Sequence, residues 1–409
     1  MKKRIVFVAN YFYPDFASTG QLLTELCLEL QKEFEIVVIA VQPEQNKDKK
    51  TRLFEEDYLE NIKIVRVKTP EVVKTNKLSR LRFIMAYFIL STFALLTIKK
   101  IDTIFTISSP PVLGGLIGTI GKLFKRSKHV YNIQDFNPEQ AEAVSYTDKK
   151  WVFDIARRID NWNCKQSDHI IVVGKDMQET LSNRFRGHNV PRSTVINNWT
   201  DEKEIIPLSK EHPRVKRFLE EHQLQNQFIV MYSGNLGLYY DLENMIKVTD
   251  AFKDEPCLSF VFIGDGAVKK SMQQFIKEKK INNVHFLPFQ PKEFIKYSLN
   301  AADVHLVVNQ KGIKGVSVPS KIYGVMAAGK PVIGVLEQGS EAQRLIEESS
   351  CGLVVEPTDY IGIIKSIRTM YEMERHDINE MGIRGRNYLE QHLKKEISIT
   401  KYKSLLVTV

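Results

Sequence analysis

Short runs of valine, isoleucine and phenylalanine recur along the chain, separated by segments whose apolar residues have helical spacing. This pattern is typical of parallel strands that are buried on both faces and joined by helices. In the first half we predict strands at 5–9, 36–40, 62–67, 103–107, 129–133, 169–173 and 194–196. In the second half we predict strands at 228–233, 258–263, 284–287, 304–308, 331–335 and 353–355. The pattern predicts an α/β protein with two doubly wound halves.

A charged stretch at 198–227, which contains Pro207 and Pro213, interrupts this alternation. We expect it to be a linker and the start of a second domain. The length of 409 residues agrees, because one hydrophobic core rarely supports more than about 250–300 residues. Two facing α/β domains are expected to bind a ligand in the cleft between them, at the carboxyl ends of their strands.

The composition, with 43% hydrophobic and 26% charged residues, is that of a soluble globular protein and excludes collagenous, coiled-coil and disordered chains. The four cysteines lie far apart without a Cys-x-x-Cys pair, so we expect a reducing cytosol and neither a disulfide framework nor a thiolate zinc site. The first residues are basic and then apolar, like a signal peptide. Because this apolar run ends already at Asn10, we expect a buried strand instead.

The formal net charge of +9 favours an anionic partner. Residues 62–100 contain nine basic residues and one acid, Glu71. Within this block, 83–98 are uncharged; as a helix they would reach about 24 Å, too short to span a hydrocarbon core of ~30 Å. A second apolar stretch, 112–124, ends among four basic residues, Lys122, Lys125, Arg126 and Lys128.

Two interpretations of these segments stay open. In the first, they are buried helices of an α/β domain with solvated ends. In the second, both segments belong to a membrane-facing surface whose basic residues bind anionic lipid at about 1 kcal/mol each. Within the segment 77–100 these would be Arg80, Arg82, Lys99 and Lys100. Nucleic acid is a less suitable partner, because the basic residues flank apolar helices instead of forming a polar stripe with interleaved aromatic residues.

Candidate chemistry in the first half lies where predicted strands end. Gly20 follows the first strand and begins a helix, where a small residue lets backbone N–H groups approach an anionic ligand; taken alone, it is better explained by a tight turn. Asp135 and Glu139 follow the fifth strand, and one of them could act as a base or accept a hydrogen bond from a sugar hydroxyl. The alternative is an Asp-initiated turn before Pro138.

Glycine turns follow the first two strands of the second half. Gly234, Asn235 and Gly237 would let the backbone close on a diphosphate. Gly264 and Asp265 form the next turn, for which a purely structural role is the alternative. Neither turn has the Gly-Lys-Ser/Thr of a P-loop or the G-x-G-x-x-G of a dinucleotide-binding dehydrogenase.

The most informative segment is a short helix that begins after Pro319 and Ser320 and ends at Gly329. Lys321 in its first turn is unfavourable for the helix dipole, which prefers anions there. A phosphate bound between the lysine and the helix would explain it, whereas a solvated lysine is the alternative. Glu341 follows the next strand and offers a carboxylate to the same cleft.

Six motifs follow one another between residues 167 and 333. They are Ser-Asp-His-Ile-Ile-Val-Val at 167–173, Asn-Asn-Trp-Thr-Asp at 197–201, Ser-Gly-Asn-Leu-Gly at 233–237, Phe-Ile-Gly-Asp-Gly at 262–266, Ala-Asp-Val at 302–304 and Ala-Ala-Gly-Lys-Pro-Val-Ile at 327–333. In this order they resemble glycosyltransferase family 4, and more closely its bacterial branch that extends O-antigen, capsule or exopolysaccharide units on a lipid carrier.

The resemblance implies a GT-B fold, with two facing Rossmann-like domains and an interdomain cleft. Residues 1–200 would bind the acceptor and 201–386 the nucleotide sugar, and a C-terminal helix at about 387–409 would pack back on the first domain. It also implies retention at the anomeric carbon without a required metal or other cofactor. The chain has no Asp-x-Asp motif, which agrees with the last point.

The family's roles carry over by position. Gly20 would lie against the donor sugar and diphosphate, and Asp135 would face the sugar near the acceptor. Glu139, four residues after Asp135, is the second catalytic candidate. In the second domain, Gly234, Asn235 and Gly237 would approach the diphosphate, and Glu341 would line the donor end of the cleft. The positions of Gly264, Asp265, Ser320 and Lys321 in the sequence add these residues to the expected donor site.

Two departures from the family pattern stand out. The family's paired glutamates fall on Val316 and Gly324, and Leu238 to Asp241 replace its Arg/Lys pair. We expect Lys321 to supply the lost positive charge.

The leading hypothesis is a retaining hexosyl- or N-acetylhexosaminyl-transferase that moves a sugar, with UDP-sugar favoured as donor, to a polyprenyl-diphosphate-linked saccharide. It would work in the cytoplasm at the inner face of the cell membrane, with other polysaccharide-assembly enzymes as further partners. A nucleotide-sugar epimerase of the same fold is the alternative, but the nine histidines form no acid/base cluster in the sequence. A non-catalytic scaffold protein is a third hypothesis, because the paired glutamates are missing.

Overall fold

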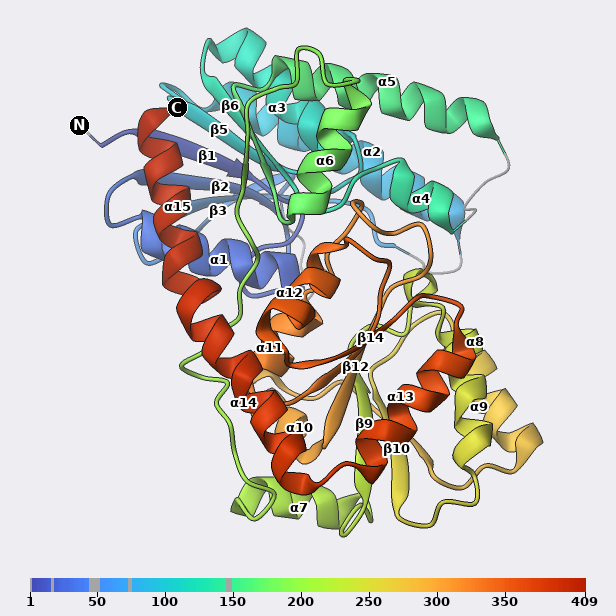
Figure 1. Cartoon of the computed structure of the whole chain (residues 1–409). Coiled ribbons are helices and arrows are strands. Elements are labelled where there is room, and N and C mark those ends of the chain that lie inside the picture. The colour runs from blue at the N-terminus through green and yellow to red at the C-terminus, as the bar shows by residue number, and fades with distance from the viewer. Residues whose placement is uncertain (1, 16–17, 44–51, 73–75, 145–148) are drawn as a thin grey trace. The chain divides into compact units, whose positions relative to one another are not determined.

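The computed structural model describes all residues except 1, 16–17, 44–51, 73–75 and 145–148. It divides into two compact units (Figure 1). The first unit comprises Met1–Glu142, Thr147–Asn197 and Ile399–Val409, and the second comprises Ala143–Tyr146 and Asn198–Ser398. Each unit has its own sheet and its own core, so each is described by itself.

The first unit contains an eight-stranded sheet with the order β3-β4-β2-β1-β5-β6-β7-β8. Its strands are β1 (Arg4–Val8), β2 (Glu35–Val41), β3 (Phe54–Leu59), β4 (Ile62–Val67), β5 (Thr103–Ile107), β6 (Lys128–Ile133), β7 (His169–Val172) and β8 (Ser193–Val195). The seven strands predicted from apolar runs are confirmed, and their ends agree with the prediction to within one residue. All of them pair in parallel, as predicted.

The prediction missed one strand, β3, which pairs antiparallel with β4 at the edge of the sheet. Its sequence, Phe-Glu-Glu-Asp-Tyr-Leu, contains three acids and no continuous apolar run, and none of its side chains is buried. Charged residues are common on edge strands, where they discourage pairing with another chain. The expectation of a sheet of parallel strands buried on both faces is therefore wrong at this edge.

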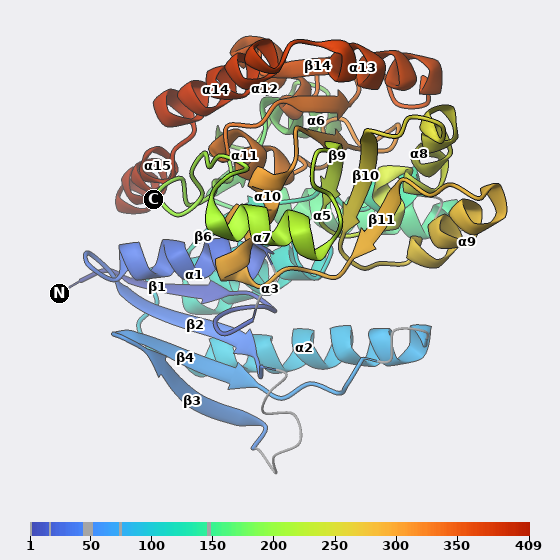
Figure 2. The same cartoon turned by 90° about the horizontal axis from the view of Figure 1, so that it is seen from below.

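Helices cover both faces of this sheet. α2 (Lys77–Thr97), α3 (Leu113–Lys125) and α5 (Lys150–Gln166) cover one face, where Val6 and Ile104 pack with residues of α2. α1 (Ser18–Leu30) and α15 (Lys395–Thr408) lie side by side on the other face (Figures 1 and 2), where the ring of Tyr402 packs near Phe105. The remaining helices are α4 (Glu139–Ala143) and α6 (Lys175–Arg184).

The C-terminal helices divide differently from the prediction. α14 (Arg375–His392) lies within the second unit, and α15 begins in the second unit and joins the first only from Ile399. Of the stretch 387–409, only 399–409 therefore groups with the first unit. The hydroxyl of Tyr402 accepts a hydrogen bond from the Asn132 side chain at 3.1 Å, which fixes this last segment to β6.

α2 is longer than the uncharged stretch suggested. It begins at Lys77, after Asn76, whose side chain accepts hydrogen bonds from the N–H groups of Leu78 and Ser79. At 21 residues it is about 31 Å long. The inference that this segment is too short to cross a membrane is therefore wrong: residues 78–97 are long and apolar enough to do so, although the core helix of a soluble protein can meet the same criteria.

The second unit contains a six-stranded, wholly parallel sheet with the order β11-β10-β9-β12-β13-β14. Its strands are β9 (Phe228–Ser233), β10 (Leu258–Ile263), β11 (Val284–Leu287), β12 (Val304–Val308), β13 (Val332–Val335) and β14 (Gly352–Val355). All six were predicted, because their apolar runs are continuous and their ends are marked by glycine, proline or asparagine.

Helices join these strands and complete the core of the second unit. They are α7 (Pro213–Glu221), α8 (Leu242–Met245), α9 (Lys269–Lys279), α10 (Ile295–Ala301), α11 (Lys321–Ala327), α12 (Glu341–Ser349), α13 (Tyr360–Glu372) and α14. α7 lies inside the stretch predicted as a linker, and its Val215 and Phe218 are buried with residues of β9 and β10. The second half of that stretch is thus an integral part of this unit.

Candidate functional site

Two glycine turns lie together at the carboxyl edge of the second sheet. β9 and β10 are neighbours, so the turns that follow Ser233 and Ile263 meet at the same edge. The Gly234 N–H donates to the carbonyl of Ile263 at 2.9 Å, and the Leu236 N–H donates to the carbonyl of Asp265 at 2.9 Å. The backbone of both turns is therefore fixed before any ligand binds.

The two turns require glycine at their closest points. Gly234 and Gly264 have φ values of +145° and +144°, a region that other residues rarely adopt. A Cβ atom on Gly264 would lie 2.0 Å from the carbonyl oxygen of Gly234, and one on Gly234 would lie 2.3 Å from Cε of Lys321. The glycines predicted from the sequence thus let two backbone turns and one lysine side chain approach each other.

Lys321 lies across the first turn. It is the first residue of α11, directly after the cap residue Ser320, and its ammonium lies 4.0 Å from the ring centre of Tyr240 and 5.1 Å from that of Tyr232. It forms no hydrogen bond or ion pair with any residue that the structure describes. Burial alone lowers the pKa of Lys321 to about 8. A cation held by aromatic rings without an anionic partner is well suited to receive a phosphate.

The remaining predicted residues of this group are also close by. Asn235 is anchored because its carbonyl accepts a hydrogen bond from the Tyr232 hydroxyl at 2.7 Å, and a Cβ on Gly237 would lie 2.9 Å from Nδ2 of Asn235. Gly237 also borders a small pocket of about 210 Å³, which is lined among others by Asp241, Glu243 and Gln310.

Glu341 lies elsewhere on the second sheet, where it begins α12 after β13. Its carboxylate is buried and forms an ion pair of 2.6 Å with Arg344, three residues later in the same helix. The described contacts do not bring it to the two glycine turns, so its predicted place at the donor end of the site stays a prediction.

The predicted residues of the first unit follow β1 and β6. Gly20 is the third residue of α1, and a Cβ there would lie 3.1 Å from Cβ of Tyr11, so this glycine lets the segment after β1 approach the helix. Asp135 is half buried, and its backbone N–H donates to the hydroxyl of Ser108 at 3.2 Å. Both lie at the carboxyl edge of the first sheet.

Glu139 is held by two arginines, Arg184 and Arg157. Burial raises the pKa of its carboxyl group, but the hydrogen bond and charge of Arg184 outweigh this and hold that pKa below its usual value. Glu139 is therefore ionised, with both oxygens paired. This geometry favours a positioning role over proton transfer, and the predicted catalytic role stays untested.

Sequence reasoning did not find Arg184, which organises this corner of the first unit. Besides Glu139, it pairs with the buried Asp160 at 2.6 Å, donates to the carbonyl of Asn137 at 3.0 Å and stacks on the ring of Phe136. It thus fixes the loop that carries Asp135. Because Arg184 lies 45 residues after Glu139 in the chain, no local sequence pattern indicated that the two would pair. Tyr240, which contacts Lys321 from 81 positions away, was missed for the same reason.

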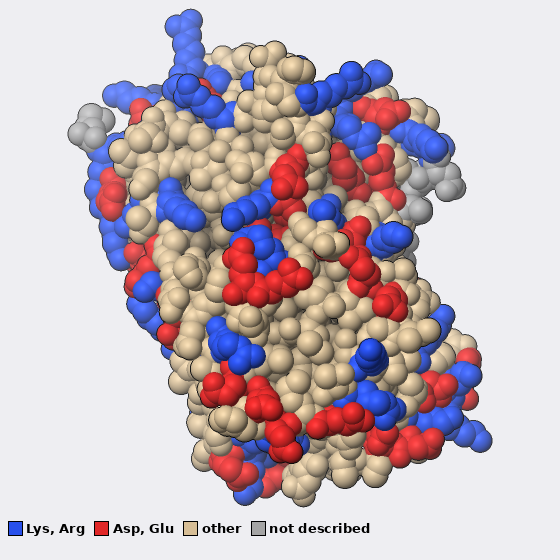
Figure 3. Space-filling model, viewed as in Figure 1, with Lys and Arg blue, Asp and Glu red and all other residues tan. Residues whose placement is uncertain are grey.

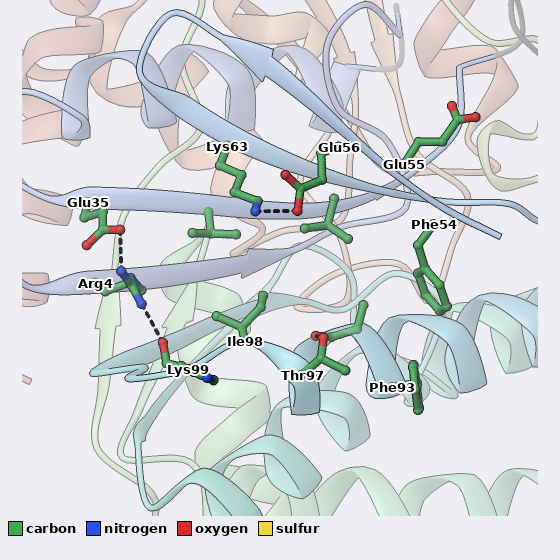
Figure 4. A pocket seen from close by; sticks show the side chains of 13 residues that line it. Arg4, Glu35, Phe54, Glu55, Glu56, Lys63, Phe93, Thr97, Ile98 and Lys99 are labelled. Carbon is green, nitrogen blue, oxygen red and sulfur yellow. Dashed lines mark hydrogen bonds and ion pairs between the residues drawn. The ribbon is translucent and has the colours of Figure 1, made fainter. Parts of the chain in front are cut away.

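A larger pocket of about 560 Å³ lies in the first unit but contains none of the predicted site residues (Figure 4). Its wall is apolar, with Phe54, Phe93 and Ile98, and its charged lining residues are three acids and three bases, of which Arg4–Glu35 and Lys63–Glu56 form ion pairs. A rim with balanced charges does not favour a nucleotide. Among the described residues, no group of three or more His, Cys, Asp or Glu side chains is arranged to hold a metal ion.

Several solved structures share this architecture. Sucrose-phosphate synthase of Thermosynechococcus elongatus gives a TM-score of 0.76 at 15% identity, and HepE of Anabaena gives 0.74 at 15%, each over 100% of both chains. A trehalose-6-phosphate enzyme structure from E. coli gives 0.74 at 12% identity, over 99% of this chain and 98% of that one. The predicted fold is thereby confirmed: the chain has the GT-B fold of glycosyltransferases.

Sequence comparison identifies the family. Residues 215–387 match the family described as glycosyl transferases group 1. WbjE of Pseudomonas aeruginosa, named as a glycosyltransferase, is 30% identical over 277 residues, which are 67% of each chain. WcaI of Escherichia coli (strain K12), named as a colanic acid biosynthesis glycosyl transferase, is 30% identical over 172 residues, 42% of this chain and 41% of its own. The chain belongs to the group 1 glycosyl transferases.

Proposed function

We propose that the protein is a retaining glycosyltransferase of family 4 that transfers a hexose or N-acetylhexosamine from a UDP-sugar to a saccharide carried on a polyprenyl diphosphate. The observation that carries the proposal is Lys321, whose ammonium is held beside two rigid glycine turns without an anionic partner among the described residues. Family membership supports the transfer reaction, and the name of WcaI supports a role in polysaccharide synthesis.

In this proposal the donor diphosphate binds at the carboxyl edge of the second sheet. The backbone of the turns at Gly234 and Gly264 approaches its oxygens, and Lys321 neutralises their charge through charge-assisted hydrogen bonds. The lysine would supply the positive charge that the family's Arg/Lys pair provides elsewhere, so no metal or other cofactor is required. UDP is favoured as the nucleotide of the donor, because HepE was solved with UDP and the E. coli neighbour with UDP-2-fluoro glucose.

The proposed reaction breaks the bond between the sugar's anomeric carbon and the diphosphate oxygen. The acceptor hydroxyl oxygen then forms its bond to that carbon on the same face, and its proton passes to the leaving diphosphate. Asp135 would orient the sugar or the acceptor, and Glu139 with Arg184 would hold the loop that carries Asp135. This arrangement needs no protein group to act as base.

The proposed acceptor is insoluble in water, so the first unit must approach a bilayer. α2 supports this, because Leu81, Met85 and Ile89 lie exposed along it, whereas the exposed Phe93 packs beside Phe54 at the pocket. Four exposed basic residues lie near its ends: Arg80, Arg82, Lys99 and Lys100. We therefore propose that α2 lies in the interface of the inner face of the cell membrane, with the remainder of the protein in the cytoplasm, where other polysaccharide-assembly enzymes are further candidate partners.

The test is a donor and acceptor screen with the purified full-length protein. UDP- and GDP-sugars are incubated with and without a polyprenyl-diphosphate-linked saccharide, and products are analysed by mass spectrometry and by NMR of the new glycosidic bond. Transfer with retained anomeric configuration is expected. Interconversion of free nucleotide sugars would indicate an epimerase instead, and nucleotide binding without turnover on any acceptor would indicate a scaffold protein.

A further inference from the structure

Exposed apolar side chains gather on three helices of the first unit. Among the described residues, 23 large hydrophobic side chains are exposed, and 12 of them lie on α2, α3 and α5. α3 packs against both α2 and α5, and all three cover the same face of the sheet. We call their outward side the three-helix layer. Concentration of exposed apolar residues on one surface marks a site of interaction.

α5 is the most unusual member of this layer, because large apolar residues lie on its exposed side and polar residues lie among its buried ones. Its buried side contains Phe153 and Cys164 together with two polar residues, Asp160 and Asn163, which hydrogen-bond to Tyr131 and to the carbonyl of Val112. Its outward side instead carries five apolar residues at helical spacing: Trp151, Val152, Ile155, Ile159 and Trp162. A helix that faces water normally has the opposite arrangement.

α3 connects the outward sides of α2 and α5. Glycines on its inner side let it approach the sheet closely; a Cβ on Gly114 would lie 2.0 Å from the carbonyl oxygen of Ile107. Its outward side is also apolar, with Leu116 and Ile120 half buried and Leu123 and Phe124 exposed. The apolar surface therefore continues from α2 across α3 to α5.

The charge of this layer indicates its partner. The segments 77–100, 113–128 and 149–166 contain 14 basic and 2 acidic residues, a net charge of +12, whereas the whole chain has +9. The rest of the chain is thus slightly acidic. Three of the basic residues, Lys122, Lys128 and Arg157, form ion pairs with acids outside these segments. Basic side chains project from the upper edge of the first unit, while acidic and basic ones alternate over the second (Figure 3). An apolar surface with strongly basic borders complements an anionic bilayer.

We propose that α5 is a second membrane-binding element, and that the three-helix layer as a whole, not α2 alone, lies on an anionic lipid bilayer, with Trp151 and Trp162 at the boundary between headgroups and acyl chains. The side chains of Trp151 and Trp162 are 61% and 41% exposed, as expected for residues that bind at the interface. This inference rests on the proposed function, because it identifies the surface by which the enzyme reaches its lipid-linked acceptor.

Tryptophan fluorescence of the full-length protein tests the proposal directly. The chain has three tryptophans, and the third, Trp199, is buried in the second unit. Phosphatidylglycerol vesicles with brominated acyl chains should quench the emission to roughly half or less, since two of the three rings would lie against lipid. Phosphatidylcholine vesicles should have little effect. In the double variant Trp151→Phe and Trp162→Phe, the remaining Trp199 signal should not respond to bromine.

Matched isoleucine variants test how much the apolar side chains of α5 contribute to vesicle binding. Ile155→Ala with Ile159→Ala should lower the partition coefficient onto phosphatidylglycerol vesicles by about tenfold, because both side chains would leave lipid contact. Ile361→Ala removes the same atoms from a side chain that is 82% exposed on α13 in the second unit, and it should leave binding unchanged. Sedimentation with the vesicles measures all of these variants.

The outcomes separate this inference from the membrane contact of α2. One outcome is that reversing the charges of Arg80, Arg82, Lys99 and Lys100 at the ends of α2 abolishes vesicle binding, while the α5 variants bind normally and the tryptophans are not quenched. In that case α5 stays in water and the inference is wrong, but the proposed function stands. If neither set of changes alters binding, both membrane proposals fail. If Trp151 and Trp162 become shielded from water at high protein concentration without lipid, a second copy of the chain covers α5. This outcome also overturns the inference.

Discussion

Lys321 is the residue on which the proposed donor site depends most. Its ammonium lies near two aromatic rings and no described carboxylate, so replacement by methionine removes the charge while keeping most of the volume. A charge-assisted hydrogen bond contributes about 1.5–3 kcal/mol, so Lys321→Met should weaken UDP binding by roughly 10- to 150-fold in isothermal titration calorimetry.

Lys330 provides the matched control for this measurement. Burial lowers its pKa to about 8 as well, but it lies just before β13, at the amino edge of the same sheet. Lys330→Met should therefore leave UDP affinity unchanged. Equal affinity of the Lys321 variant and the wild type would remove Lys321 from the site.

The lowered pKa of Lys321 predicts a pH dependence of donor binding. In the ligand-free protein the ammonium is fully present only well below its pKa of about 8. The UDP diphosphate is already fully ionised above about pH 7.5, so affinity should fall as the pH rises through 8 and Lys321 loses its proton. Titrations between pH 7 and 9.5 should show this fall in the wild type and not in Lys321→Met. A flat wild-type profile would contradict the assignment.

Asp135 and Glu139 should respond differently to removal of their charge. Asp135→Asn should abolish most turnover on the lipid-linked acceptor while leaving the melting temperature nearly unchanged, because the amide keeps the size and shape of the carboxylate. Glu139→Gln should lower the melting temperature, since it removes the charge that Arg184 and Arg157 share. Activity assays and differential scanning fluorimetry on both variants distinguish the two roles. Full specific activity of Asp135→Asn would show that Asp135 only forms a turn.

At the scale of single residues, the sequence predicted those residues that a local sequence pattern marks. Gly234, Gly264 and Lys321 were found because each follows a strand or begins a helix in the sequence. Their partners could not be found in this way. Tyr240 approaches Lys321 because the neighbouring parallel strands β9 and β12 end at the same edge of the sheet. Arg184 reaches Glu139 from the last residue of α6.

At the scale of elements, continuous apolar runs were enough to predict thirteen strands, since a strand buried on both faces needs such a run. β3 has none, because an edge strand needs only its hydrogen bonds to β4. The prediction for α2 covered only the uncharged residues 83–98, because the charges of Arg80 and Arg82 suggest a helix boundary. In the structure these two residues lie exposed within the first two turns of α2.

α2 also carries the prediction that belongs to this scale. Reversal of the four charges at its ends, by Arg80→Glu, Arg82→Glu, Lys99→Glu and Lys100→Glu, should abolish sedimentation with anionic vesicles and activity on the lipid-linked acceptor. The reason is that each basic residue near an anionic surface contributes about 1 kcal/mol. Wild-type binding should fall with added salt, as expected for screened charges. UDP affinity should stay near normal, and vesicle binding by the reversed protein would contradict the role of α2.

At the scale of the whole molecule, the length and the break in the strand pattern predicted two α/β units. The sequence did not reveal that the chain returns to its first unit only at Ile399, within a single helix. The reason is that α15 has no break in its pattern where it passes from one unit to the other. The buried contacts of Tyr402 with Asn132 and Phe105 determine where the first unit resumes.

This division predicts that the two units respond separately to mutation. Tyr402→Ala leaves a cavity under the first sheet and should lower its stability by about 3–5 kcal/mol, whereas Tyr402→Phe removes only the hydroxyl and should cost about 1 kcal/mol. Calorimetric melting should show the loss. UDP affinity of Tyr402→Ala, measured below its melting temperature, should stay within about twofold of the wild type, because Lys321 and both glycine turns lie in the second unit. A parallel loss of UDP affinity and stability would mean that the donor site depends on the first unit, and the assignment of donor binding to the second unit alone would be wrong.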